Sequence, residues 1–142
     1  MKVETGIPMD NWRESGPAAA AAEAGGFDGV LSFEIANDPF IPLAFAAVAT
    51  KSIQLGTSIA VCFPRSPMIM ATSAWDLHLQ SKGRFTLGLG TQVKGHNVRR
   101  FSVPWSPHNP AYANMCNPSE PYGAAGKPVK NLISRESIMR SP

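Results

Sequence analysis

Short apolar runs of strand length alternate with helix-like segments through most of this 142-residue chain. We expect the apolar runs to form strands over residues 2–7, 30–33, 53–61 and 84–89. The segments between them are expected to form helices over residues 16–24, 40–50 and 67–80. Strands that alternate with helices in this way predict an α/β fold of repeated βα units around a parallel sheet.

Cap and turn residues mark the ends of the expected helices. Ser15 is the expected N-cap of the first helix, with Pro17 in its first turn, and Gly25-Gly26 closes it. Asp38-Pro39 opens the second helix and Ser66-Pro67 opens the third. Each helix therefore has the length of a crossover between two neighbouring parallel strands.

The alternation stops near residue 106. Six of the 13 prolines lie within residues 106–142, and no helical or strand period can be counted there. This composition is typical of a loop or a disordered tail. We therefore predict two unlike parts, an α/β unit over residues 1–105 and an irregular, proline-rich tail over residues 106–142.

Composition and charge exclude several classes of partner. The net charge is only +3 and no basic stripe interleaved with aromatic residues is present, so we expect no nucleic acid. No run approaches the ~18 apolar residues of a bilayer span, and no signal region opens the chain, so we expect a cytoplasmic protein with no membrane contact. Cys62 and Cys116 form no zinc spacing, and neither His78 nor His108 has a partner at ligand spacing, so we expect no metal.

An ordered set of motifs runs through residues 1–105. In chain order they are Ala22-Glu23-Ala24-Gly25-Gly26-Phe27-Asp28-Gly29-Val30, Asp38-Pro39-Phe40, Gly56-Thr57-Ser58-Ile59-Ala60-Val61, Arg65-Ser66-Pro67, Ser81-Lys82-Gly83-Arg84-Phe85-Thr86-Leu87-Gly88-Leu89-Gly90-Thr91 and Arg99-Arg100-Phe101-Ser102-Val103-Pro104-Trp105. The set is far more specific than any one motif, because a lone Gly-Thr or Gly-x-Gly occurs in many turns. It resembles the bacterial luciferase-like monooxygenases, and within them the F420-dependent oxidoreductases.

The resemblance implies a (β/α)8 TIM barrel with its active site at the C-terminal ends of the strands. Residues 1–105 would supply the N-terminal half of such a barrel, about four βα units, followed by the irregular tail. A half barrel leaves two parallel edges open, so we expect a homo-oligomer that associates through these sheet edges. A doubly wound nucleotide-binding domain is a weaker alternative, because no Gly-x-Gly-x-x-Gly turn follows the first expected strand.

The genetic code offers an explanation of the tail. Read from the third nucleotide of each codon, a degenerate back-translation of residues 110–123 permits Arg-Glu-Tyr-Val-Gln-Ser-Leu-Arg-Ala-Ile-Trp. Within it, Asn114-Met115-Cys116 fixes the valine codon. The resemblance predicts a helix of this kind after Trp105. Our hypothesis is that the reading frame slips near residues 106–110 and that the tail is an out-of-frame translation.

The chemistry implied by the resemblance is two-electron transfer at FMN or coenzyme F420, with a small organic molecule as substrate. Either O₂ is activated, as in a monooxygenase, or hydride passes between F420 and the substrate. Because barrels bind phosphate mainly through their last βα loops, we expect this truncated chain to be inactive alone. The alternative function is a non-catalytic half-barrel that binds a partner or associates with itself.

The resemblance also places the candidate site residues. Ser58-Ile59 falls where the family has a bulge with a cis peptide that backs the cofactor ring, although a plain buried strand is the alternative. The other residues expected at the cofactor are Gly88, Gly90 and Thr91. Glu34 and Asn37 follow the second strand and are the candidate catalytic residues, although Glu34 suits the start of a helix equally well. Solvated surface is the default for Lys94, His96, Arg99 and Arg100.

Overall fold

A computed structural model of the chain describes residues 1–104, and the tail prediction for residues 106–142 lies outside the described residues. Its main sheet has four parallel strands in the order β1-β2-β3-β5. They are β1 (Glu4–Gly6), β2 (Gly29–Ser32), β3 (Gln54–Thr57) and β5 (Phe85–Thr86). A second parallel pair is formed by β4 (Ala60–Val61) and β6 (Leu89–Gly90).

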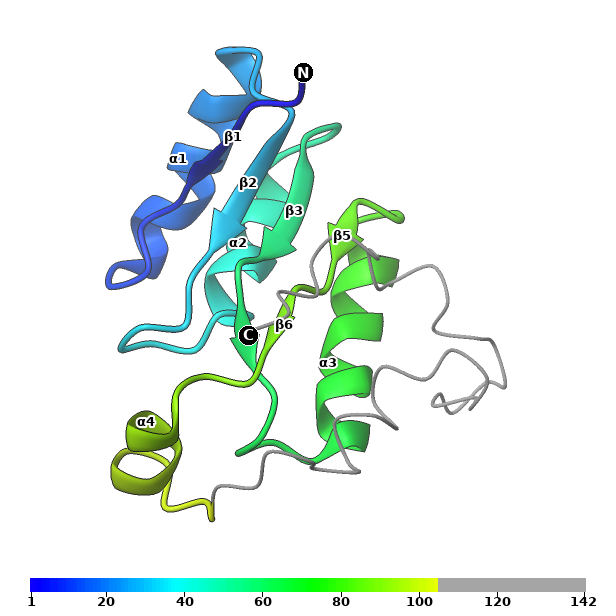
Figure 1. The fold of residues 1–142 in the computed structure, drawn as a ribbon. Coiled ribbons are helices and arrows are strands. Elements are labelled where there is room, and N and C mark those ends of the chain that lie inside the picture. The colour runs from blue at the N-terminus through cyan, green and yellow to red at the C-terminus, as the bar shows by residue number, and fades with distance from the viewer. Residues whose placement is uncertain (105–142) are drawn as a thin grey trace.

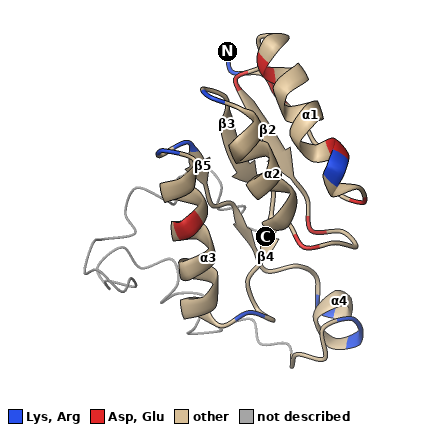
Figure 2. Ribbon diagram, turned by 180° about the vertical axis from the view of Figure 1, so that it is seen from behind, with Lys and Arg blue, Asp and Glu red and all other residues tan. Residues whose placement is uncertain are grey.

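Three helices cover one face of the sheet, as Figures 1 and 2 show from opposite sides. They are α1 (Trp12–Ala24), α2 (Ile41–Ala49) and α3 (Pro67–Gln80), and a short helix α4 (Lys94–Arg99) follows β6. Each of α1, α2 and α3 connects neighbouring parallel strands, so the predicted α/β class and its βα repeats are confirmed. The sequence did not predict α4.

Two expected strands are each divided into two pieces. The run over residues 53–61 forms β3 and β4, separated by Ser58 and Ile59, and the peptide bond between these two residues is cis. The run over residues 84–89 forms β5 and β6. Continuous strands were therefore the wrong expectation, because β3 pairs with β5 and β4 pairs with β6 in separate ladders.

The first helix begins earlier than predicted. Its N-cap is Asn11, whose side chain accepts a hydrogen bond from the backbone N–H of Arg13 and donates one to Glu14. Ser15 was the wrong cap: it lies inside α1 and is fully buried, and its hydroxyl donates to the carbonyl of Pro8. Pro17 likewise lies inside the helix. Asn followed three residues later by Glu is a capping signal that outweighs Ser15.

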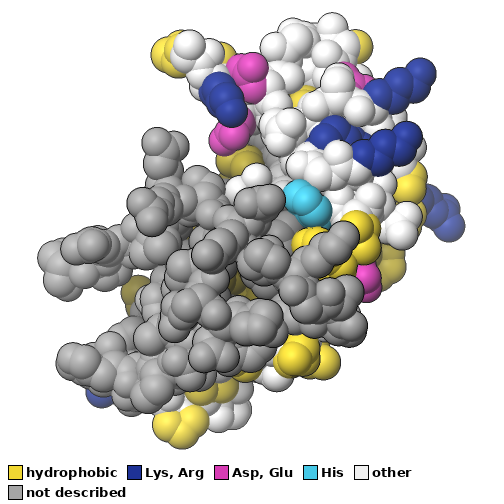
Figure 3. All heavy atoms as spheres, turned by 90° about the vertical axis from the view of Figure 1, so that its right-hand side faces the viewer, with side chains coloured by type: hydrophobic (Ala, Val, Ile, Leu, Met, Phe, Trp, Pro, Cys, Tyr) yellow, Lys and Arg dark blue, Asp and Glu magenta, His cyan; other side chains and the backbone are white. Residues whose placement is uncertain are grey.

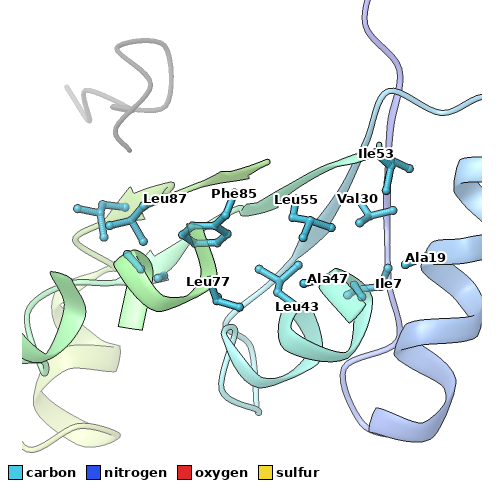
Figure 4. Packing of buried hydrophobic residues seen from close by; sticks show 14 of the residues in the cluster. Ile7, Ala19, Val30, Leu43, Ala47, Ile53, Leu55, Leu77, Phe85 and Leu87 are labelled. Atoms are coloured by element: carbon cyan, nitrogen blue, oxygen red, sulfur yellow. The ribbon is translucent and has the colours of Figure 1, made fainter. Parts of the chain in front are cut away.

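The core lies between the sheet and its helices (Figure 4). Strand residues that point toward the helices, among them Val30, Leu55 and Phe85, pack against Leu43 of α2 and Leu77 of α3, and all five are buried. Burying side chains of this size from water contributes about 1.5–3 kcal/mol each. This apolar layer fixes the positions at which the strands end.

Two charged residues, Glu23 and Arg84, form hydrogen bonds at the end of the sheet where the strands begin. Glu23 accepts hydrogen bonds from the backbone N–H groups of Lys51, Ser52 and Ile53. The buried guanidinium of Arg84 donates to the carbonyl oxygens of residues 47, 50, 53 and 81 and to the hydroxyl of residue 50. These bonds join the end of α2 and the end of α3 to the start of β3.

Candidate functional site

The residues that follow the strands form the opposite edge, at the bottom of Figure 1. The backbone N–H of Ser58 donates to the carbonyl of Ser32 at 2.7 Å, and that of Ala60 donates to Gly88 at 2.8 Å. The breaks in the two divided strands therefore lie side by side, next to the end of β2. All seven sequence-predicted site residues lie at or just beyond strand ends on this edge.

Glu34 is buried just after β2, and its carboxylate has two strong partners. Oε2 accepts the backbone N–H of Val61 at 2.6 Å and a hydrogen bond from Arg65 Nη1 at 2.6 Å. Arg65 Nη1 also donates to the carbonyl of Val61 at 3.0 Å, so the pair binds both sides of one β4 residue. Arg65 reaches Asp38 as well, at 3.2 Å. This ion pair fixes the strand that follows Ser58-Ile59.

Asn37 joins two neighbouring loops. Its side-chain Nδ2 donates to the carbonyl of Met9 at 2.8 Å, and Met9 lies in the loop between β1 and α1. Asn37 is half-buried, so part of its side chain faces solvent. Asp38, the next residue, accepts from the backbone N–H groups of Phe40 and Ile41 and so caps the start of α2, as predicted.

Ser58 and Ile59 are half-buried, whereas their neighbours Thr57 and Ala60 are buried. The cis peptide that the resemblance implies is present between them. This short stretch is therefore the part of the third barrel strand that a molecule at the sheet edge can touch. A plain buried strand, the alternative interpretation, does not describe it.

Gly88 and Gly90 allow close contacts between the two divided strands. A Cβ atom on Gly88 would overlap the carbonyl oxygen of Thr57, and Thr57 also exchanges side-chain hydrogen bonds with Gly88. A Cβ atom on Gly90 would stand 2.7 Å from the side chain of Ile59. The need for glycine at both positions thus arises from strand packing. The contact at Gly90 also limits where the side chain of Ile59 can lie.

Thr91 directly follows β6 and is hydrogen-bonded to a residue of α4. Its carbonyl accepts a hydrogen bond at 2.8 Å from the side chain of Asn97, which is fully buried. Asn97 Oδ1 is the one buried side-chain N or O atom of the described residues that lacks a hydrogen-bond partner. Its neighbours Lys94, His96, Arg99 and Arg100 are exposed, in agreement with solvated surface as their default.

Sequence reasoning missed the roles of Arg65 and Asn97. Arg65 was part of a recognised motif, and an acidic residue at position 34 is the signal that could have suggested a partner. Nothing in the six-residue helix α4 marks Asn97 as its buried residue. Both residues act through the backbone of the site, and backbone partners leave no pattern in the side-chain sequence.

Charged side chains lie at both ends of the sheet, and the two with a shifted pKa, Glu23 and Arg84, lie at the same end. Hydrogen bonds from Ser52, Ile53 and Lys51 lower the pKa of Glu23 to about 2, and burial lowers the pKa of Arg84. Both groups lie at the end where the strands begin. Figure 3 shows Lys and Arg side chains gathered at that end as well. The candidate site lies at the other end.

Four half-buried residues at this edge, Ser58, Ile59, Gly90 and Thr91, form what we call the wall. It offers two hydroxyl groups, peptide groups and one aliphatic side chain, and no charged side chain belongs to it. It offers no cation for a phosphate. Over residues 1–104, no group of three or more His, Cys, Asp or Glu side chains could hold a metal ion, and no helix is long and apolar enough to cross a membrane.

Comparison with known proteins places this geometry in a family. The family profile described as luciferase-like monooxygenase matches residues 2–115. The uncharacterized protein Rv1360 of Mycobacterium tuberculosis is 50% identical over 105 residues, which is 74% of this chain and 31% of that protein.

Two solved structures share the fold. The coenzyme F420-dependent tetrahydromethanopterin reductase of Methanopyrus kandleri is 28% identical, with a TM-score of 0.63 over 74% of this chain and 31% of that chain. The oxygenating constituent of 3,6-diketocamphane monooxygenase from Pseudomonas putida, in complex with FMN, is 19% identical, with a TM-score of 0.65 over 81% of this chain and 37% of that one. The chain thus spans about a third of the length of the proteins it matches.

Proposed function

The chain belongs to the luciferase-like monooxygenase family, and from that membership we propose that it forms the ring-binding wall of an oxidoreductase that uses FMN or coenzyme F420. Relatives of both cofactor types support the proposal, since one solved structure contains FMN and another is F420-dependent. The observation that carries it is the convergence of three strand ends, which brings Glu34, Ser58-Ile59 and Gly90 to one edge of the sheet.

Each site residue has a specific part in the proposed function. Ser58, Ile59 and Thr91 contact and orient the ring, while Gly88 and Gly90 permit the strand packing behind it. When bound, the ring supplies two-electron chemistry that no side chain can provide. Glu34 positions the wall rather than transferring protons, because Oε2 is bound to both Arg65 and Val61. Asn37 can donate or accept a hydrogen bond from a small organic substrate but cannot act as an acid or base at neutral pH.

The proposed chemistry is either hydride transfer with F420 or O₂ activation on reduced FMN. A proton donor or acceptor and the phosphate-binding loops would come from the C-terminal half of the barrel, where barrels of this kind bind phosphate. We propose that residues 1–105 are the N-terminal part of the enzyme and that turnover requires the remaining part. The reading-frame hypothesis would account for a family match that covers residues 2–115 and not the remaining 27 residues of this chain.

Cofactor titration tests the proposed function. We expect F420 or FMN fluorescence to be quenched by the chain, with an affinity in the micromolar range or weaker because the phosphate loops are not part of it. The variant Ile59→Asp introduces a charge into the wall and should weaken binding at least tenfold. The matched control Leu79→Asp makes a similar change at an exposed position of α3, 53% exposed, and should leave binding unchanged.

Two results would contradict the proposal. In the first, the chain quenches the fluorescence of neither F420 nor FMN. In the second, Ile59→Asp binds the cofactor as tightly as the parent chain and the control Leu79→Asp do. Binding without turnover is expected for residues 1–105, whereas no binding together with a defined oligomer would favour the non-catalytic half-barrel.

DNA sequencing tests the reading-frame hypothesis separately. The region to sequence covers codons 100–142 and about 600 nucleotides beyond them, a length set by the missing half of a ~250-residue barrel. A single-nucleotide correction should restore an open frame that continues the family sequence. A reading frame that is correct as written, with no family-like sequence in the shifted frame, would refute the hypothesis.

A further inference from the structure

Helix α4 lies in a stretch of chain that has no acidic side chain. Residues 77–104 contain no Asp or Glu. Within this stretch, four exposed basic side chains belong to α4 and the residue that follows it: Lys94, His96, Arg99 and Arg100. Figure 2 shows Lys and Arg on α4 in blue and no red. The electrostatic potential around α4 is therefore positive, and no acid of its own segment neutralises it.

Three of these side chains share one side of the helix. His96 lies three residues before Arg99 and four residues before Arg100. Residues at these spacings are neighbours on a helix surface. We call His96, Arg99 and Arg100 the α4 basic face.

The α4 basic face has no acidic partner among residues 1–104. Both ion pairs of that part of the chain belong to Arg65, which binds Glu34 and Asp38. The guanidinium of Arg100 lies over the ring of Phe101, 4.8 Å from the ring centroid. Stacking of this kind orients a guanidinium and leaves the N–H groups at its rim available to an anion.

Hydrogen bonds hold α4 next to the wall. The side-chain Nδ2 of Asn97 donates to the carbonyl of the wall residue Thr91 at 2.8 Å. The backbone N–H of Val103 donates to the carbonyl of Asn97 at 2.9 Å and fixes the chain after the helix. Figure 1 shows α4 beyond β6, at the edge where the strands end. A molecule whose body contacts the wall can therefore extend an anionic end to α4.

The position of α4 in a barrel favours a substrate over the cofactor as the source of this anion. Barrels bind phosphate mainly through the loops after their seventh and eighth strands. β6 is the second piece of the fourth expected strand, and in a closed ring of eight strands the fourth lies opposite the eighth. The phosphate of the cofactor is thus expected across the barrel from α4.

We propose that the α4 basic face binds the anionic group, a carboxylate or a phosphate, of an organic substrate whose reacting end lies at the wall. This substrate class rests on the proposed function, because only that function brings the cofactor ring to the wall. A guanidinium suits such groups, since it can donate two parallel hydrogen bonds to a carboxylate or a phosphate. The wall itself has no charged side chain, so α4 distinguishes an anionic substrate from an uncharged analogue.

An NMR titration of the full 142-residue chain, followed through backbone amide signals, tests the anion site without any cofactor. The probes are glutarate and inorganic phosphate, in separate titrations, and the uncharged glutaramide is the control ligand. Signals of residues 94–101 should shift with an affinity on the order of millimolar. The affinity should fall several-fold when NaCl is raised from about 20 mM to about 200 mM. The anion that binds more tightly identifies the group that the substrate carries.

Matched variants separate the α4 basic face from net charge. Arg99→Gln/Arg100→Gln should weaken anion binding at least about fivefold. The control Lys51→Gln/Lys82→Gln removes two exposed charges where the strands begin and should leave the affinity unchanged. The single variant Arg99→Gln keeps Arg100 over Phe101 and should weaken binding at least about twofold, so the test does not depend on the fold of the double variant.

Three outcomes would overturn the proposal. The signals of α4 stay unchanged with both anions, or they shift equally with glutaramide. The control double variant weakens binding as much as Arg99→Gln/Arg100→Gln, which would show that net charge alone attracts the anion. Arg99→Gln/Arg100→Gln weakens the quenching of FMN or F420 as strongly as it weakens glutarate binding, which would assign α4 to the cofactor.

Cofactor titration of the parent chain distinguishes failure of this proposal from failure of the proposed function. If glutarate binds at α4 and neither FMN nor F420 binds, the proposed function fails and the substrate assignment fails with it, while the anion site itself stands. If a cofactor binds and neither anion does, the proposed function stands and the α4 proposal alone is overturned.

Discussion

Glu34 and Arg65 form an ion pair of 2.6 Å that holds the backbone of the strand between them. The same carboxylate oxygen accepts the N–H of Val61, and the same guanidinium nitrogen donates to the carbonyl of Val61. An acidic residue in a candidate active site thus acts on the protein's own backbone. The side chain of Glu34 is 4% exposed and that of Arg65 is 20% exposed, so water weakens the pair only in part.

Glu34→Gln should destabilise the fold. The amide oxygen can still accept the N–H of Val61, but the partner of Arg65 loses its charge. Breaking a buried pair typically costs about 3–5 kcal/mol. Arg65 would still pair with Asp38 and contact some solvent. We therefore expect the free energy of unfolding to fall by about 1–3 kcal/mol, measured by urea denaturation.

A double-mutant cycle with Arg65→Gln separates the pair from its surroundings. The coupling energy should be about 1–3 kcal/mol, and the control Asp38→Asn, at the more exposed end of the network, should cost less than about 1 kcal/mol. Additive losses at Glu34 and Arg65 would show that the pair contributes nothing of its own.

Glu23 should make stability depend on acidic pH. Its folded pKa of about 2 lies below the ordinary value of 4.5, so its contribution is complete above about pH 4.5. That contribution is lost as the pH falls from 4.5 through 2, because the folded carboxylate must then take up a proton. The measurement is the urea midpoint at a series of pH values.

Glu23→Gln provides the comparison for this effect. The variant should be less stable than the parent chain at pH 6, and the difference should shrink steadily below pH 4.5. Asp76→Asn removes an exposed carboxylate of α3 and should show no such convergence. A constant difference between parent chain and Glu23→Gln at all pH values would contradict the prediction.

The fold was predictable where a signal lies within a single element. Gly25 ends α1, Asp38 caps α2, and Ser66-Pro67 begins α3, as local sequence indicated. The division of the strands was not predictable from periodicity, because residues 53–61 are apolar on either side of the break. Only the resemblance indicated a special peptide at Ser58-Ile59.

The candidate site was predictable in its location and not in its contacts. Residues after parallel strands must meet at one edge, so the topology predicts that Glu34, Asn37 and Thr91 lie at the same end of the sheet, whereas their proposed roles come from the resemblance. Their partners are backbone groups of Val61 and Met9 and the side chain of Asn97, on other loops. Such contacts depend on the three-dimensional path of the loops, which a single sequence does not encode in any local pattern.

Arg84 should be among the most sensitive positions of the fold. Its five hydrogen bonds go to four carbonyl oxygens and one hydroxyl, at the ends of α2 and α3 and just before β3. Arg84→Met would leave these acceptors buried without a donor, at a cost of about 3–5 kcal/mol in the free energy of unfolding. Arg84→Lys should recover less than half of the loss, since one ammonium cannot reach all of them.

The exposed Arg99 provides the control for Arg84. Arg99→Met should change the free energy of unfolding by no more than about 0.5 kcal/mol. Equal losses for Arg84→Met and Arg99→Met would refute a structural role for the buried guanidinium. Thermal and urea unfolding followed by circular dichroism both provide the measurement.

The two glycines at the candidate site should respond differently to alanine. In Gly88→Ala the new methyl group overlaps the carbonyl of Thr57, a backbone atom that cannot move without separating the strands, so we expect loss of several kcal/mol and little folded protein. In Gly90→Ala the new methyl group meets the end of the Ile59 side chain, which can rotate away. That variant should fold, and it should quench cofactor fluorescence less because the position of Ile59 in the wall has changed.

The control is Gly95 of α4, which has open space around it. Gly95→Ala should be neutral or should stabilise the fold by about 0.5–1 kcal/mol. Equal stability of the Gly88→Ala and Gly95→Ala proteins would show that the strands do not approach each other as closely as this structure indicates.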